Sequence, residues 1–155
     1  MQPTTSVSVR PATLDDCPVV YRFLCDLEET TLDPVAFGAV FARNTTSPSV
    51  WYRVAEVGAE VIGFVSCHAQ WLLHHTGRVG EIQELYVQPD YRNQRIGHQL
   101  VAEVVQIARQ EGFINLEVTT NARRTDTIRF YEQTGFRASH RKLVMGLMPE
   151  DKESV

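Results

Sequence analysis

The stretch Glu81–Leu100, EIQELYVQPDYRNQRIGHQL, is the part of the chain on which the fold prediction rests. An apolar strand pattern ends at Val87, a short polar loop follows, and an amphipathic helix pattern starts near Ile96. The first turn of a helix has backbone N–H groups without partners and carries the positive end of the helix dipole, so it binds anions well. Gly97 permits close approach of a ligand because it has no Cβ. The stretch therefore predicts a strand, loop and helix that hold a phosphate.

Two common phosphate loops do not fit this stretch. The dinucleotide fingerprint G-x-G-x-x-G needs more glycines than the one that lies here, and G-x-x-x-x-G-K-[ST] is missing. The loop Arg92–Gly97, RNQRIG, instead resembles the acyl-CoA loop [RQ]-x-x-G-x-[GA] of the GCN5-related N-acetyltransferases (GNAT family), which follows a strand ending in V-x-P. Arg95 stands where that loop usually has its first glycine, but backbone donors at this position still allow phosphate binding. An ordinary strand–loop–helix corner is the alternative interpretation.

The remaining patterns predict a mixed α/β fold. The chain has 155 residues, of which 43% are hydrophobic, as expected for one domain with a sizeable core. Helical periodicity predicts helices that begin near residues 16, 34, 96 and 125. Alternating or β-rich patterns predict strands at residues 7–10, 51–57, 61–70, 79–87, 114–118 and 143–147. The resemblance implies the GNAT fold, a mixed central sheet flanked by helices, in a single domain over residues 1–155 with a core at about 7–148.

Composition argues against several kinds of partner and location. The net charge is −4, whereas nucleic-acid binding usually needs a basic face. No apolar run approaches the ~18 residues of a membrane span, and residues 1–10 lack the features of a signal peptide. The three cysteines have no C-x-x-C spacing, which favours a reducing cytoplasm over a disulfide framework. Many relatives dimerise through a sheet edge or the last strand, so residues 143–147 are a candidate edge for a homodimer.

Glu81 and Glu84 are candidate general bases for an acyl transfer to an amine. Such a reaction needs a base for the ammonium, a donor for the oxyanion and an acid for the leaving thiolate. Burial in a strand raises the pKa of a carboxyl toward a useful range. Ile82 belongs to one phase of the strand alternation while Leu85 and Val87 belong to the other, which predicts a β-bulge near Glu84. The bulge would turn both carboxylates toward the acceptor. The alternative is that they only satisfy buried donors.

The resemblance also implies an acetyl-CoA site. In the family the acetyl thioester of this cosubstrate lies against the bulged strand, where a bulge leaves backbone N–H and C=O groups free to bond a ligand. The expected cofactor-binding residues are Leu85, Tyr86, Val87, Arg92, Asn93, Gln94, Arg95, Ile96, Gly97, His98 and Asn121.

Tyr131 is the candidate general acid. Residues 130–136, FYEQTGF, resemble the family segment F-Y-x-x-x-G-F, in which the tyrosine often lies near the sulfur of CoA. A phenol has an ordinary pKa of about 10, so it is protonated at neutral pH and can donate. A packed aromatic side chain is the alternative.

A more specific resemblance covers most of the chain and is strongest over residues 65–136. His68, the pair His74-His75, GEIQEL at 80–85 and TTNARR at 119–124 look like the aminoalkylphosphonate N-acetyltransferases. That resemblance implies a small primary amine with a phosphonate as the acceptor. Arginine suits a phosphonate because its planar fork bonds two oxygens. The candidate substrate-binding residues are His74, His75, Arg123 and Arg124; a contact with the CoA 3′-phosphate or a solvated surface is the alternative for the arginines.

Two further sets of residues have open interpretations. His68, His75 and Glu81 are candidate ligands of a divalent metal, although adjacent histidines point oppositely in extended backbone, so His74 and His75 are not expected to share an ion. Glu28 and Glu29 are candidate substrate contacts or simply a solvated helix end.

Three functions remain as alternatives to acetylation of an aminophosphonate. These are acetylation of another small amine (an aminoglycoside, polyamine or amino acid), acetylation of a peptide or protein amine, and a non-catalytic acyl-CoA sensor.

Overall fold

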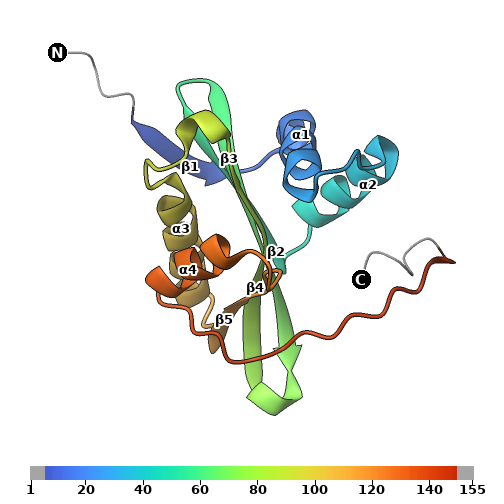
Figure 1. The fold of residues 1–155 in the computed structure, drawn as a ribbon, viewed down its shortest axis with the longest axis vertical. Helices are drawn as coiled ribbons and strands as arrows, with labels where there is room; N and C mark the ends of the chain where they lie inside the picture. The colour runs from blue at the N-terminus through green and yellow to red at the C-terminus, as the bar shows by residue number, and fades with distance from the viewer. Residues whose placement is uncertain (1–5, 150–155) are drawn as a thin grey trace. The chain divides into compact units, whose positions relative to one another are not determined.

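The computed structural model of the protein describes residues 6–149 and is built around a twisted β-sheet (Figure 1). The chain divides into two compact units, Met1–Val118 and Thr119–Val155. Within the described residues the sheet has five strands in the order β1-β2-β3-β4-β5, antiparallel up to β4 and parallel between β4 and β5. Its strands are β1 (Val7–Pro11), β2 (Val50–Val57), β3 (Glu60–Leu72), β4 (Gly77–Val87) and β5 (Asn115–Val118).

Three α-helices of the first unit flank this sheet, which confirms the predicted mixed sheet with helices (Figure 1). They are α1 (Cys17–Glu28), α2 (Pro34–Thr45) and α3 (Ile96–Gln110), with short 3-10 turns at Leu14–Asp16, Leu73–His75 and Pro89–Tyr91. The residues at the start of α2 show why a helix begins at this point of the sequence. Asp33 Oδ1 accepts from the backbone N–H of Ala36 at 2.8 Å, and Pro34 occupies the first helical position, where its missing N–H costs nothing.

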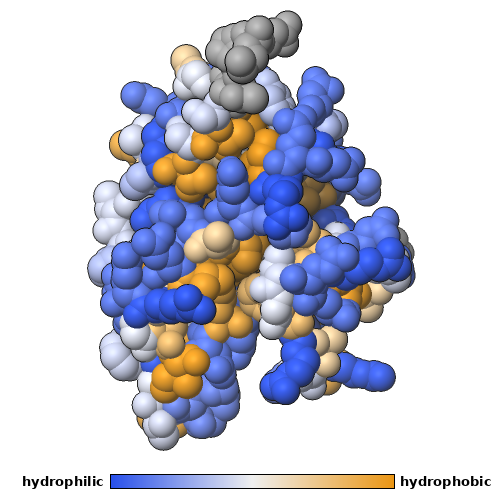
Figure 2. All heavy atoms as spheres, turned by 90° about the vertical axis from the view of Figure 1, so that its left-hand side faces the viewer, coloured by the Kyte–Doolittle hydropathy of each residue, from blue (hydrophilic) through white to orange (hydrophobic). Residues whose placement is uncertain are grey.

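Each helix buries the apolar face that its periodicity predicts. The helix α3 buries Ile96, Leu100, Val101, Val104, Ile107 and Ala108. On the other face of the sheet, α1 and α2 pack on a cluster that contains Val20, Phe23, Leu24, Phe41, Val54, Phe64 and Tyr86. In this cluster the rings of Phe23 and Tyr86 stack with centroids 4.9 Å apart. Polar residues cover much of the surface in Figure 2, with apolar residues in patches between them.

The strand β4 carries the predicted bulge. Val65 pairs with Leu85 and Cys67 pairs with Ile82, so two residues of β4, Gln83 and Glu84, lie opposite the single Ser66 of β3. The phase slip in the apolar pattern of β4 has this geometric cause. The bulge sets the direction of the two carboxylates of this strand.

The second unit contains α4 (Thr125–Gln133). The strand predicted over residues 143–147 is wrong, because these residues have no regular secondary structure. Their alternation shows which side chains would share a face, but a strand forms only beside a hydrogen-bonding partner, and residues 143–147 pair with none of the described strands. Leu143, Met145 and Leu147 are 92%, 82% and 87% exposed. In the part of the chain that the structure describes, no helix is long and apolar enough to cross a bilayer.

Candidate active site

Ser66 holds Glu84 at the bulge by two hydrogen bonds. Its hydroxyl donates to Glu84 Oε2 at 2.5 Å and accepts from the backbone N–H of Glu84 at 3.0 Å. Ser66 itself is completely buried. The expectation that the bulge leaves its backbone N–H groups free for a ligand is therefore wrong for Glu84, because the hydroxyl of Ser66 opposite the bulge accepts this N–H. The carboxylate, in turn, is held in one orientation.

The bulge turns Glu81 and Glu84 to the same face of the sheet, as predicted. Glu81 lies opposite His68 in the pairing of β3 with β4, and Glu84 bonds Ser66. Ser66 and His68 are two residues apart on one strand, so they share a face. Phe64, two residues earlier, belongs to the cluster under α1 and α2. Both carboxylates therefore lie on the face that these two helices cover.

The environment of Glu84 favours its protonated form. Burial raises the pKa of this carboxyl, and the negative charge of Glu28 acts in the same direction. The hydrogen bond from Ser66 and the charge of His68 lower the pKa, but burial is the largest of these effects and the pKa is raised overall. Glu84 is thus a stronger base than an ordinary glutamate once it has ionised. This is the property that a general base for an ammonium needs.

A cavity of about 480 Å³ lies between the helices α1 and α2 and the sheet, with Glu84 in its wall. Four aromatic side chains line it: Phe37, Phe41, Tyr52 and Phe64. Aliphatic side chains of Val20, Leu24, Leu32, Ala36 and Val40 complete the apolar wall, and the other polar lining residues are Glu28, Asp33 and Gln83. The placement of Glu28 agrees with its interpretation as a substrate contact. The cavity therefore has a mostly apolar wall with carboxylates in it.

The loop before α3 passes through a left-handed residue directly into the first turn of the helix. Arg95, the N-cap of α3, has φ 62° and ψ 19°, a left-handed conformation in which glycine is usual. Arg92 Nε donates to the carbonyl of Val87 at 2.9 Å, and its guanidinium lies 5.5 Å from the ring centroid of Tyr86. Arg92 thereby fastens the loop to the end of β4. Arg95, which stands where the family motif usually has a glycine, thus adopts a left-handed conformation that glycine favours.

Replacing Arg95 with glycine should stabilise the protein and leave acetyl-CoA binding nearly unchanged. A non-glycine residue in left-handed backbone destabilises the folded state by roughly 1 kcal/mol. Glycine removes this strain, but it also raises the conformational entropy of the unfolded chain, which offsets part of the gain in stability. We expect Arg95→Gly to raise the urea midpoint and Arg95→Val to lower it, because a β-branched side chain fits this conformation worst. Isothermal titration with acetyl-CoA is the second measurement. Loss of most of the affinity in Arg95→Gly would show that the arginine side chain, not the backbone, holds the ligand.

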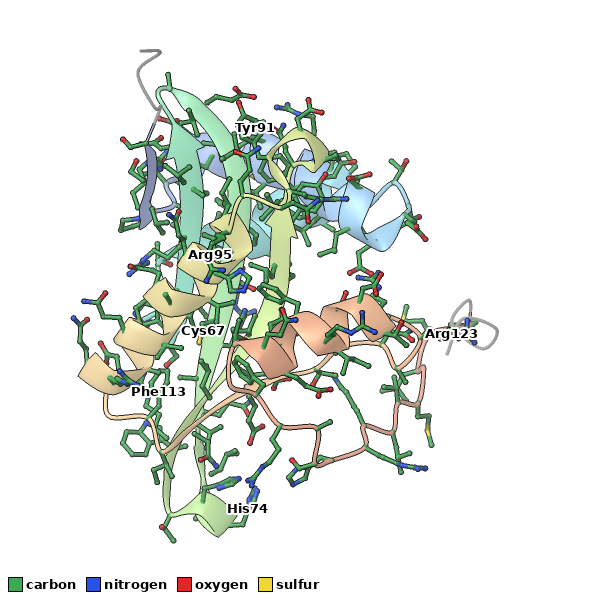
Figure 3. All side chains as sticks on the ribbon, turned by 60° about the vertical axis from the view of Figure 1, so that its left-hand side comes forward. Cys67, His74, Tyr91, Arg95, Phe113 and Arg123 are labelled. Atoms are coloured by element: carbon green, nitrogen blue, oxygen red, sulfur yellow. The ribbon has the colours of Figure 1, made fainter. Side chains whose placement is uncertain are left out.

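His74 and His75 lie in the turn between β3 and β4 and do not line the cavity. Figure 3 shows His74 at the far end of this hairpin from Arg95. The two histidines are expected to point oppositely only in extended backbone, whereas the backbone forms a 3-10 turn there and the ring centroids are 4.3 Å apart. His75 Nδ1 is 3.4 Å from Asn115 Nδ2, and its Nε2 is 3.8 Å from Glu117 Oε1. His75 therefore contacts β5.

The candidate metal ligands are not brought together. Among residues 6–149, no three side chains of histidine, cysteine, aspartate or glutamate are placed to hold an ion. His68 lies opposite Glu81, whereas His75 lies beside Glu117. The proposed set His68, His75 and Glu81 therefore does not form a coordination sphere here.

The remaining predicted site residues belong to the second unit. Tyr131 is 6% exposed, and burial raises the pKa of its phenol to about 12. Its ring packs edge-on against Phe130 and Phe136, with centroids 5.2 Å and 5.5 Å away. Asn121 Oδ1 accepts from the backbone N–H of Arg123 at 2.9 Å, so this side chain shapes its own loop. The functional roles of Tyr131, Asn121, Arg123 and Arg124 stay predictions.

Sequence reasoning missed Ser66 and the aromatic wall. A fully buried hydroxyl in the apolar run FVSCHA was a usable signal for Ser66, because a buried hydroxyl needs a partner. No comparable signal exists for Phe37, Phe41 and Tyr52. Their spacing predicts core positions, and only the packing of two helices against the sheet makes part of that core a cavity wall.

Comparison with known proteins identifies the class of protein that carries this site. Residues 17–136 match the acetyltransferase (GNAT) family. The chain belongs to this family and is an acetyl-CoA-dependent N-acetyltransferase. It is 43% identical over 139 residues to the aminoalkylphosphonate N-acetyltransferase of Salmonella typhimurium (strain LT2), which covers 90% of each chain.

Solved structures show the same fold. A transcriptional regulator from Bacillus halodurans C-125 superposes with a TM-score of 0.86 at 29% identity, over 92% of this chain and 100% of that one. An aminoglycoside N-acetyltransferase in complex with CoA gives a TM-score of 0.85 at 15% identity, over 94% and 97% of the two chains. The second likeness concerns the fold alone.

Proposed function

We propose that this protein transfers the acetyl group of acetyl-CoA to the primary amine of an aminoalkylphosphonate. The observation that carries the chemistry is the carboxylate of Glu84, half-buried on the bulge of β4, held by Ser66 and exposed to a cavity. The identity of 43% with an aminoalkylphosphonate N-acetyltransferase, over 90% of both chains, supports this class of acceptor.

Glu84 acts first as the partner of the ammonium and then as its base. It takes one proton from the ammonium, directly or through a water, and the freed lone pair attacks the thioester carbonyl. The tetrahedral intermediate collapses as the C–S bond breaks. The nitrogen loses its second proton to water, which gives the neutral amide, and water later reprotonates the tyrosine that serves the leaving thiolate. Tyr131, whose pKa of about 12 keeps it protonated at neutral pH, supplies the proton for the CoA thiolate. Glu81, on the same face of β4, adds negative potential for the cationic acceptor.

Backbone groups at the start of α3 hold the pyrophosphate of acetyl-CoA. The first turn of α3 presents N–H donors and the positive end of the helix dipole. None of the described residues that line the cavity is basic. We therefore assign the phosphonate to Arg123 and Arg124, whose guanidinium groups bond two oxygens each.

A CoA-release assay over a panel of amines tests the substrate class. We expect kcat/KM for aminomethylphosphonate to exceed that for glycine, its carboxylate counterpart, by at least about tenfold. The smaller carboxylate of glycine would leave some of the donors that bind the phosphonate oxygens without a partner. Polyamines, aminoglycosides and a lysine-rich peptide complete the panel. Equal values for the phosphonate and glycine, or turnover of the peptide alone, would contradict the proposal.

One observation favours a second candidate, acetylation of a cationic amine such as a polyamine or an aminoglycoside. Glu28 and Asp33 line the cavity together with Glu84 and would attract a second positive charge. Asp33 Oδ1, however, already caps α2. In the same panel, this candidate predicts that spermidine has the highest kcat/KM.

A further inference from the structure

We infer that the acceptor carries an uncharged apolar group, aryl or branched alkyl, which fills the cavity between α1, α2 and the sheet while its amine meets Glu84. This inference rests on the proposed function in one respect, that Glu84 marks the acceptor site. It goes further because it specifies the part of the acceptor that does not react.

The size of the cavity is the first argument. Its volume of about 480 Å³ lies within the range of pockets that bind drug-sized ligands, about 300–1,000 Å³. An acceptor of a few heavy atoms would occupy a small part of it. The remaining apolar surface would stay wet, and binding would gain nothing from removing that surface from water.

The chemistry of the wall is the second argument. The rings of Phe37, Phe41, Tyr52 and Phe64 form a continuous series, with successive centroids 6.3 Å, 5.2 Å and 5.3 Å apart. The hydroxyl of Tyr52 accepts from Asn44 Nδ2 at 2.8 Å, so its polar end already has a partner and the ring remains for contact. Aromatic rings pack favourably on aryl and branched alkyl groups.

The distribution of charge is the third argument. Glu84 and Glu28 lie at the cavity wall, and the described lining residues include no lysine, arginine or histidine. An anion inside would meet carboxylates and no cation, which is costly in a half-buried site. The ammonium therefore lies at Glu84, the apolar group extends along the aromatic rings, and any phosphonate lies outside the cavity. A 1-aminoalkylphosphonate with a large side group has this shape.

Two pairs of acceptors test the inference on the unmodified enzyme. One pair is aminomethylphosphonate and 1-amino-2-phenylethylphosphonate; the other is ethylamine and 2-phenylethylamine. We expect the phenyl compound to have the higher kcat/KM by at least about tenfold in every pair that is turned over, since one or more buried carbons discriminate by that factor. Preference for the phenyl compound among the plain amines, with no phosphonate turned over, would refute the phosphonate proposal and support the inference that the cavity binds an apolar group of the acceptor. Equal values within both pairs, or turnover of none of the four, would overturn the inference.

A matched pair of variants locates the effect in the cavity. Ala36 and Ala39 are both exposed on α2, but only Ala36 lines the cavity. The change Ala36→Phe should therefore occupy space and lower kcat/KM for the phenyl compound far more than for its small partner, about tenfold or more in the ratio. Ala39→Phe adds the same side chain outside the cavity and should leave the ratio unchanged. Equal effects of the two variants on the ratio would overturn the inference, and thermal unfolding verifies that both are folded.

Discussion

Glu84→Gln should lower kcat/KM at neutral pH by about 10²- to 10⁴-fold, the usual contribution of a general base. Glutamine keeps the size of the side chain and can still bond the Ser66 hydroxyl that holds Glu84, but it cannot take a proton. The affinity for acetyl-CoA should hardly change, because that ligand rests on the loop before α3. Glu81→Gln is the matched comparison, since it makes the same change on the same face of β4 outside the cavity wall.

The pH dependence of the rate gives the sharper readout. Burial raises the pKa of Glu84, so its basic form is gained only as the pH rises above the range of an ordinary glutamate. Wild-type kcat/KM should therefore fall on the acid side as Glu84 takes up a proton. Glu84→Gln should lose this acid limb and recover in part at high pH, where the free amine is abundant. If both glutamine variants keep the wild-type kcat/KM at pH 7, the carboxylates are structural and the amine arrives already deprotonated.

The same substitution should change stability in the opposite direction to activity. Because the pKa of Glu84 is higher in the folded protein than in the unfolded chain, the folded state binds this proton more tightly. The resulting stabilisation is complete below the unfolded pKa and is lost as the pH rises through the folded pKa. Glu84→Gln should therefore have a higher urea midpoint than the wild type at neutral pH, and the difference should disappear in acid. A lower midpoint at neutral pH would contradict this.

Gly97→Val should raise the Kd for acetyl-CoA on the order of 100-fold, because its side chain would occupy the place of the pyrophosphate at the start of α3 and displace it from the N–H donors. Arg95→Ala should weaken binding only a few-fold, since the donors are backbone groups and Arg95 supplies no more than a nearby charge. Isothermal titration measures both values, and unfolding curves verify that the helix is intact. Equal losses in the two variants would contradict a site built from backbone donors.

Most of the fold was predictable because it depends on periodicity. The apolar spacing in α3 and the alternation in the five strands are local properties of the chain, and each predicts which face is buried. The bulge was predictable for the same reason: Ile82 and Leu85 cannot share a face in a regular strand, so a residue must be inserted between them. The prediction of Glu84 as a candidate base followed from its position beside that insertion.

The features that could not be predicted depend on which elements meet. The pairing of Ser66 with Glu84 requires the register of β3 on β4, which no local pattern contains. Residues 143–147 failed as a strand because alternation says nothing about a partner. The close approach of the His74 and His75 rings could not be predicted, because a short turn, unlike a strand, has no periodicity from which the direction of a side chain follows.

The left-handed backbone at Arg95 has a consequence for how such loops are found. The loop requires a turn of a given hand, and glycine is only the residue that meets this requirement most cheaply. Arg95 meets it with φ 62°. A search pattern written in amino-acid letters therefore defines a smaller set of proteins than the geometry allows. A pattern that states the required torsion angles, and treats the residue as one solution among several, would recover the members whose loops carry a side chain at this position.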